Sequence, residues 1–99
     1  MVKHIVLLDL REDLTKEEQL EAMEGIKSRL EALVGKIDGL LDAKVYFDMI
    51  DTCNSRIVLD STLESEEALR GYIVHPEHKL AGTYVKSKVA NKRSADFFI

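Results

Sequence analysis

The sequence predicts a single α+β domain over residues 1–99, built as a four-stranded antiparallel sheet with helices on one face. Segments that alternate apolar and polar residues indicate strands, and segments whose apolar residues recur at three- and four-residue steps indicate helices. They follow one another as strand, helix, strand, strand, helix, helix, strand, which is a split βαβ arrangement. No change of composition marks a linker, so we expect one folded unit.

The first half of the chain has the pattern strand, helix, strand. Residues 2–10 are rich in Val, Ile and Leu and predict a strand. Thr15 and Glu18 have the spacing of a capping box, which predicts a helix start, and Gly35 is a natural stop. One inward-facing stripe of this helix would consist of Leu20, Met23, Ile26, Leu30, Leu33 and Val34. Residues 41–49 then alternate clearly and predict the second strand.

The second half begins with a hairpin. Residues 51–55 are typical of a turn, and residues 56–63 alternate again, so this segment should pair antiparallel with the strand before it. The last segment, 90–99, is interpreted as the closing strand of the sheet.

Pro76 divides the helical region between these two strands. Ser65 is expected to cap a short helix, which Pro76 must interrupt because proline supplies no amide donor and disfavours a helical residue before it. Pro76 suits the first position of a further helix that runs to about Val85, with His75 at or near its cap.

Composition excludes some classes of function. Fourteen Lys and Arg against eighteen Asp and Glu give a net charge of −4, which opposes phosphate neutralisation and makes nucleic acid an unexpected partner. The apolar run in the first ten residues is too short for a secretory core or a membrane span. Cys53 has no partner within the chain and is interpreted as a loop thiol without a role, so we expect a cytoplasmic protein.

The sheet face opposite the helices is expected to need a cover. If it carries Val6, Leu8 or alternate residues of the other strands, it forms an apolar patch of the kind that marks an interface. A second copy of the chain is the simplest cover, so a homodimer is predicted.

Three segments together resemble the stress-responsive dimeric α/β barrel family, including members of the olivetolic acid cyclase type. They are Val2–Val6 (V-K-H-I-V), Ser65–Leu69 (S-E-E-A-L) and Tyr72–His78 (Y-I-V-H-P-E-H). The resemblance spans nearly the whole chain. It implies a ferredoxin-like protomer, a dimeric barrel formed by two sheets, and a pocket in each subunit between sheet and helices.

The resemblance also implies site residues. His78 matches a general base, Tyr72 a nearby catalytic phenol, and His4 a residue that lines the same substrate pocket. An imidazole can remove a proton from carbon next to a carbonyl, and a phenol can hold the oxyanion that develops. At Ile26 or its neighbours the chain lacks the aromatic residue of the cyclase pocket, which puts the same substrate in doubt.

Structural alternatives remain open for these residues. His78 could cap or pack the junction between the two short helices, His4 could be a hydrogen-bonded core histidine, and Tyr72 could belong to the core. His75 is interpreted as structural. No third ligand joins His75 and His78, so no metal is expected, and neither haem nor another cofactor is expected.

Two functions follow as hypotheses. The first is a homodimeric small-molecule enzyme of the cyclase, isomerase or monooxygenase type, which acts on a carbonyl or phenolic compound by cofactor-free acid/base chemistry. The alternative is a non-catalytic stress-response protein that binds a ligand or serves in dimerisation.

Overall fold

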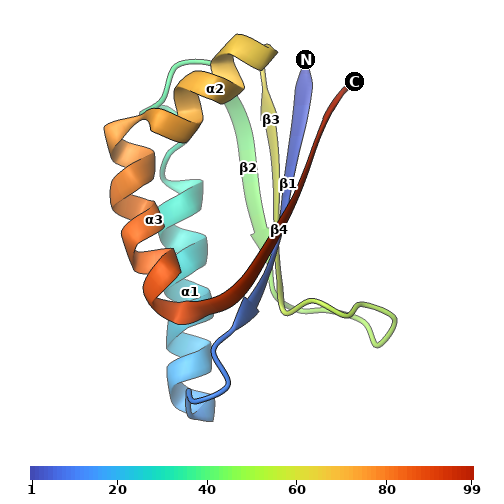
Figure 1. The fold of residues 1–99 in the computed structure, drawn as a ribbon, viewed down its shortest axis with the longest axis vertical. Helices are drawn as coiled ribbons and strands as arrows, with labels where there is room; N and C mark the ends of the chain where they lie inside the picture. The colour runs from blue at the N-terminus through green and yellow to red at the C-terminus, as the bar shows by residue number, and fades with distance from the viewer.

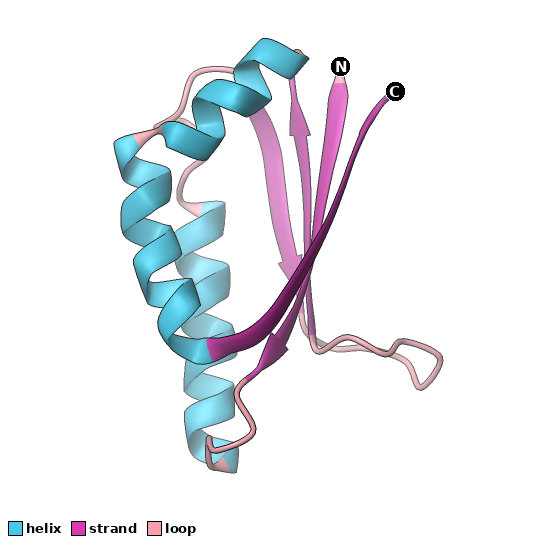
Figure 2. Ribbon diagram, viewed as in Figure 1, coloured by secondary structure: helices cyan, strands magenta, loops and turns pink.

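The computed structural model describes residues 1–99, and its elements occur in the predicted order (Figure 1). They are β1 (Val2–Leu10), α1 (Lys16–Glu31), β2 (Leu40–Tyr46), β3 (Ile57–Leu63), α2 (Glu66–Val74), α3 (Pro76–Lys88) and β4 (Val89–Phe98). The strands form one layer, and the helices cover one face of it (Figure 2). The predicted α+β architecture is confirmed.

The sheet has the strand order β2-β3-β1-β4, and every neighbouring pair is antiparallel. β1 is therefore central, between β3 and β4. Ser61 of β3 and Asp96 of β4 both lie opposite His4 of β1. Directly opposite residues of an antiparallel pair share a face, so this register gathers three polar side chains on one row of the sheet.

The core lies between the sheet and the helices. Alternate residues of β1, among them Val6 and Leu8, are buried against it, and α1 adds the fully buried Ile26. Val6 and Leu8 thus lie under the helices, so the expectation that they could form an uncovered apolar face is wrong. Their burial is explained within one copy of the chain.

The opposite face of the sheet carries a mixed surface. Its apolar side chains include Leu7, Tyr46 and Phe97, which are 37%, 53% and 48% exposed. Beside them Lys3 and Asp60 form an ion pair with a nitrogen–oxygen distance of 3.0 Å. This face is less apolar than an interface built on Val6 and Leu8 would be, yet it leaves several large apolar side chains in contact with water.

Several predicted ends are wrong by a few residues. β2 stops at Tyr46 because the chain there leaves the sheet, and residues 47–56 project as a loop away from its end (Figure 1). α1 ends at Glu31, before the turns that lead to Gly35, whereas α3 continues to Lys88.

Two members of the predicted apolar stripe of α1 do not face the core. Leu20 is 56% exposed, and Val34 lies beyond the end of the helix and is exposed too. The first turns of α1 also extend past the ends of the strands (Figure 1). A helix stripe is buried only along the length that another element covers.

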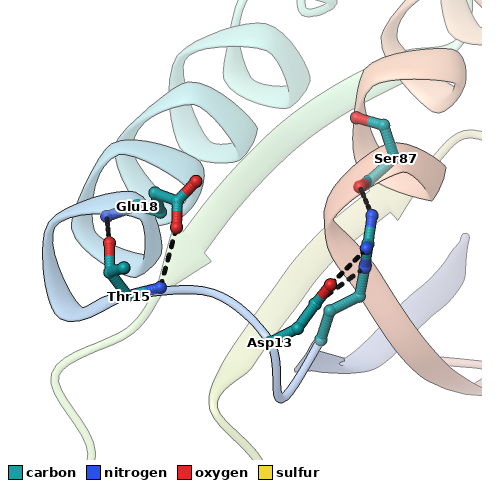
Figure 3. Close-up of polar contacts among 5 residues, drawn as sticks. Asp13, Thr15, Glu18 and Ser87 are labelled. Carbon is teal, nitrogen blue, oxygen red and sulfur yellow. Dashed lines mark hydrogen bonds and ion pairs between the residues drawn. The ribbon is translucent and has the colours of Figure 1, made fainter.

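The loop between β1 and α1 is fixed at both ends, as Figure 3 shows. The Glu18 N–H donates to Thr15 Oγ1 at 3.1 Å, and the Thr15 N–H donates to Glu18 Oε1 at 2.9 Å, so the predicted capping box is confirmed. Arg11 binds Asp13 and also donates to the carbonyl oxygen of Ser87 at 3.2 Å. This last bond joins the loop directly after β1 to the end of α3.

Candidate functional site

The break between α2 and α3 positions the site. The Ala68 N–H donates to Ser65 Oγ at 3.1 Å and begins α2, as predicted. His75 then adopts an extended conformation (φ −65°, ψ 137°) before Pro76 starts α3. The Glu77 N–H donates to His75 Nδ1 at 3.1 Å, which satisfies an amide at the start of α3. The structural interpretation of His75 is confirmed.

The three predicted site residues lie together, although they come from three different elements. The Tyr72 ring, on α2, lies 4.4 Å from the His78 ring of α3 and 5.8 Å from the His4 ring of β1, measured between ring centroids. The pair with His4 meets edge to face. Tyr72 is only 1% exposed, and its ring packs against both imidazoles.

His4 is fixed by a residue that the sequence did not indicate. Its Nδ1 lies 2.5 Å from Asp96 Oδ1, across the β1–β4 pair. The His4 carbonyl oxygen accepts a bond from Ser61 Oγ at 2.8 Å on the other side. The bond to Asp96 holds the ring of His4, and the bond from Ser61 holds its backbone, in a residue that is only 6% exposed. Ninety-two positions separate His4 from Asp96, so only the strand register brings them together.

An open cavity of about 740 Å³ lies beside this group, between the sheet and α3. His4 and His78 both line it, whereas Tyr72 lies behind the lining. The other lining residues are Val6, Leu8, Leu30, Leu59, Ile73, Lys79, Gly82, Thr83, Val85, Lys86, Val89, Ala90, Asn91 and Lys92. Its wall is apolar on the core side and basic toward α3 and β4, without an acidic side chain. A cavity of this size suits a small organic molecule.

Burial shifts the proton affinity of two site residues. Burial raises the pKa of Tyr72 to about 12, so its hydroxyl stays protonated at neutral pH. Burial also lowers the pKa of His78. The Ile73 backbone opposes this effect, and the charge of Lys92 adds a smaller lowering. His78 is therefore a neutral imidazole near pH 7 and can accept a proton.

The Tyr72 hydroxyl has no hydrogen-bond partner, although it is fully buried. Most buried hydroxyl groups in proteins have a partner, because an unsatisfied one costs about 1–3 kcal/mol of desolvation free energy. The hydroxyl is thus a free donor on a ring that packs against two imidazoles.

Other features of the chain add no ligand-binding group to this site. A second, mainly apolar cavity of about 260 Å³ lies on the far side of Ile73 and reaches Asp96. No group of three or more His, Cys, Asp or Glu side chains is arranged to hold a metal ion. Cys53 is an exposed thiol on the loop between β2 and β3, as predicted. No helix is long and apolar enough to cross a membrane.

Known proteins share this fold over the whole chain. No curated protein sequence matches it. A dimeric protein of unknown function and ferredoxin-like fold from Bacteroides fragilis is 33% identical, and the match covers 99% of this chain and 95% of that one with a TM-score of 0.91. A hydroxynitrile lyase from Passiflora edulis is 14% identical, with coverage of 99% and 92% and a TM-score of 0.79.

A cofactor-independent oxygenase from Streptomyces nogalater has the same fold at 11% identity, with coverage of 99% and 91% and a TM-score of 0.76. These two enzymes show that the fold can host different reactions, and their low identity shows the fold alone. The family model described as the stress responsive A/B barrel domain matches residues 2–99. The chain, with its ferredoxin-like fold, therefore belongs to the stress-responsive A/B barrel domain family.

Proposed function

We propose that this protein is a homodimeric enzyme that carries out cofactor-free acid/base chemistry on a small carbonyl or phenolic compound. The observation that carries the proposal is the buried Tyr72 hydroxyl, which lacks a partner and belongs to a ring that packs against those of His4 and His78. A hydroxyl left unsatisfied at this position favours a role in ligand binding, because a purely structural residue would gain stability by finding an acceptor.

Each residue has a chemical role in this proposal. His78 lines the cavity as a neutral imidazole and takes a proton from carbon next to a carbonyl group. Tyr72 stays protonated and donates a hydrogen bond to the oxyanion that develops on the carbonyl oxygen. His4, held by Asp96, lines the same end of the cavity and binds the substrate. The reacting oxygen must reach past the imidazoles, since Tyr72 lies behind the cavity wall.

The dimeric state rests on two kinds of support. The mixed sheet face leaves Leu7, Tyr46 and Phe97 exposed, and a second copy would cover them. The Bacteroides fragilis protein, which shares the fold over nearly its whole length, is described as dimeric. We propose that two copies pack through these sheet faces and form a barrel.

We also propose a cytoplasmic location, since an exposed unpaired thiol such as Cys53 suits a reducing compartment. Fractionation of cells that produce the full-length protein tests this location, and recovery from the secreted or membrane fraction would contradict it.

Proton exchange tests the catalytic proposal without knowledge of the natural substrate. Aryl ketones such as para-hydroxyacetophenone are incubated with the protein in heavy water, and loss of the methyl proton signal next to the carbonyl is followed by NMR. We expect the protein to accelerate exchange and His78→Gln to abolish that acceleration, because glutamine cannot accept the proton.

The matched control is His75→Asn, which keeps a capping side chain at the start of α3 and should keep the exchange rate. If His78→Gln retains the exchange rate of the wild type while its fold is intact, His78 is not the base.

A second candidate function is favoured by the position of Tyr72 behind the cavity wall, where it packs as a core residue would. In this case the protein is a non-catalytic stress-response protein that binds a ligand or serves in dimerisation. If the wild type binds a ligand but accelerates proton exchange in none of the aryl ketones tested, this function is favoured over the enzyme.

A further inference from the structure

Three lysines converge on the cavity that contains His78. Lys79 and Lys86 lie seven residues apart on α3, which is about two helical turns, so they share a face of the helix. Lys92 lines the same cavity from β4. None of the three takes part in an ion pair. The cavity wall is thus basic in a chain whose net charge is −4.

No acidic side chain in the cavity wall offsets these charges. Asp96, whose carboxylate binds His4, lines the smaller cavity on the far side of Ile73 and not this one. Unpaired ammonium groups around a concave surface raise the local concentration of anions, and the effect is larger in a cleft than on a flat surface.

Gly82 lies between Lys79 and Lys86 and also lines the cavity. A Cβ atom at this position would meet no heavy atom within 4 Å, so close packing does not require a glycine there. Glycine is an unfavourable residue inside a helix, and its presence leaves the surface between the two lysines open. This opening gives a ligand room to approach both ammonium groups.

We propose that Lys79, Lys86 and Lys92 bind an anionic substituent of the ligand, a carboxylate or a phosphate, while the carbonyl end of the same molecule reaches His78. The assignment of the carbonyl end rests on the function proposed above. The lysine site itself requires only that an anion and an attached organic group fit the cavity together.

Lys92 links the two ends of the ligand electrostatically. Burial is the main cause of the lowered pKa of His78, and the charge of Lys92 lowers it further, together with the charges of His4 on β1 and His75 before α3; Tyr72 faces the ring as an uncharged phenol. Lys79 and Lys86 lie on the same helix as His78. An anion that neutralises Lys92 should therefore raise the pKa of His78 and make it a stronger base in the complex.

Three matched ligands test the site by calorimetric titration of the full chain: para-acetylbenzoate, para-acetylphenyl phosphate and the uncharged para-acetylbenzamide. We expect the two anions to bind more tightly than the amide. Lys92→Gln should weaken anion binding by roughly three-fold, and joint replacement of the three lysines by Gln should weaken it on the order of ten-fold or more. The affinity for the amide should not change.

The charge-matched control is Lys16→Gln, which removes one exposed lysine at the start of α1, away from the cavity. It should leave all three affinities unchanged. The order of the two anion affinities shows which anionic group the lysines hold more tightly. Equal affinity of the wild type for the amide and the anions, or undiminished anion binding by the triple variant, would overturn the proposal.

The His78 ring provides a second measurement that does not depend on activity. Its NMR titration should shift to higher pH in Lys92→Gln and in the wild type saturated with para-acetylbenzoate. His78→Gln should still bind the anions, although it loses proton exchange. Loss of exchange in His78→Gln with no effect of the lysine variants would leave the acid/base function standing and remove the anion site.

Discussion

At the scale of single residues, Tyr72 shows most clearly how function and stability compete in this chain. Its ring fills the junction between α2, α3 and β1, which stabilises the core, whereas its hydroxyl is buried without an acceptor. Natural proteins retain such unsatisfied groups mainly at sites that bind a ligand. The two parts of this side chain therefore contribute to stability with opposite signs.

Tyr72→Phe separates these two contributions. The ring remains in place, and the uncompensated desolvation of the hydroxyl disappears, so the free energy of unfolding should rise by about 1 kcal/mol. Urea denaturation followed by circular dichroism measures this change, and proton exchange of the ketone panel should fall in the same variant. A loss of stability instead would show that the hydroxyl makes a stabilising bond in the free protein.

At the scale of elements, the contact between α1 and α3 depends on a glycine. Gly25 faces the Tyr84 ring so closely that a Cβ atom would lie 2.3 Å from the tyrosine hydroxyl oxygen. The guanidinium of Arg29 lies 3.7 Å from the centroid of the same ring. Tyr84 is thus enclosed by two residues of α1, and the close approach of the helices requires the missing side chain of Gly25.

Gly25→Ala should therefore destabilise the protein by about 1–3 kcal/mol, because Tyr84 must leave its position or the helices must separate. The control is Gly71→Ala on α2, where a Cβ atom meets nothing within 4 Å. That change should stabilise the protein by about 0.5–1 kcal/mol, since alanine favours a helix more than glycine. Thermal unfolding compares both variants with the wild type, and equal shifts in the two would refute the close contact.

Side chains of α1 bind backbone groups of the edge strand β2. The Val45 N–H donates to Glu31 Oε2 at 2.8 Å, and Lys27 Nζ donates to the Val45 carbonyl oxygen at 3.0 Å. Lys27 and Glu31 also form an ion pair along α1. Two side chains of a helix thereby occupy backbone groups on the free edge of the sheet, which prevents pairing with a further strand at this place.

At the scale of the whole molecule, the features predicted correctly are those set by short sequence segments. The capping box at Thr15, the cap at Ser65 and the break at Pro76 act within one helical turn, so the residues alone indicate them. The bond between His4 and Asp96 depends on the register of β1 and β4, which no local pattern specifies.

The residues of the candidate site divide in the same way, into those that a short sequence segment can indicate and those that only the fold brings together. The resemblance to the family implied three of its members, Tyr72 and His78 within the segment Tyr72–His78 and His4 on the first strand. Lys79 and Lys86 could have been found from their spacing on one helix face, because positions seven apart lie on the same side. Lys92 could not, since its place in the cavity wall follows from the pairing of β4 with β1.

The dimer proposal can be tested on the open sheet face through Leu7, which is central on β1 and lies opposite Arg93 of β4. In a two-fold symmetric interface Leu7→Glu introduces two carboxylates at once, and burying them should weaken dimerisation on the order of 100-fold. The fold of each copy should survive, because Leu7 points away from the helices and Arg93 can pair with the new carboxylate.

Leu80→Glu on α3, where the leucine is 70% exposed, is the control and should leave the dimer intact. Light scattering during size-exclusion chromatography measures both variants, and a Leu7→Glu protein that remains dimeric at micromolar concentration would show that the interface lies elsewhere.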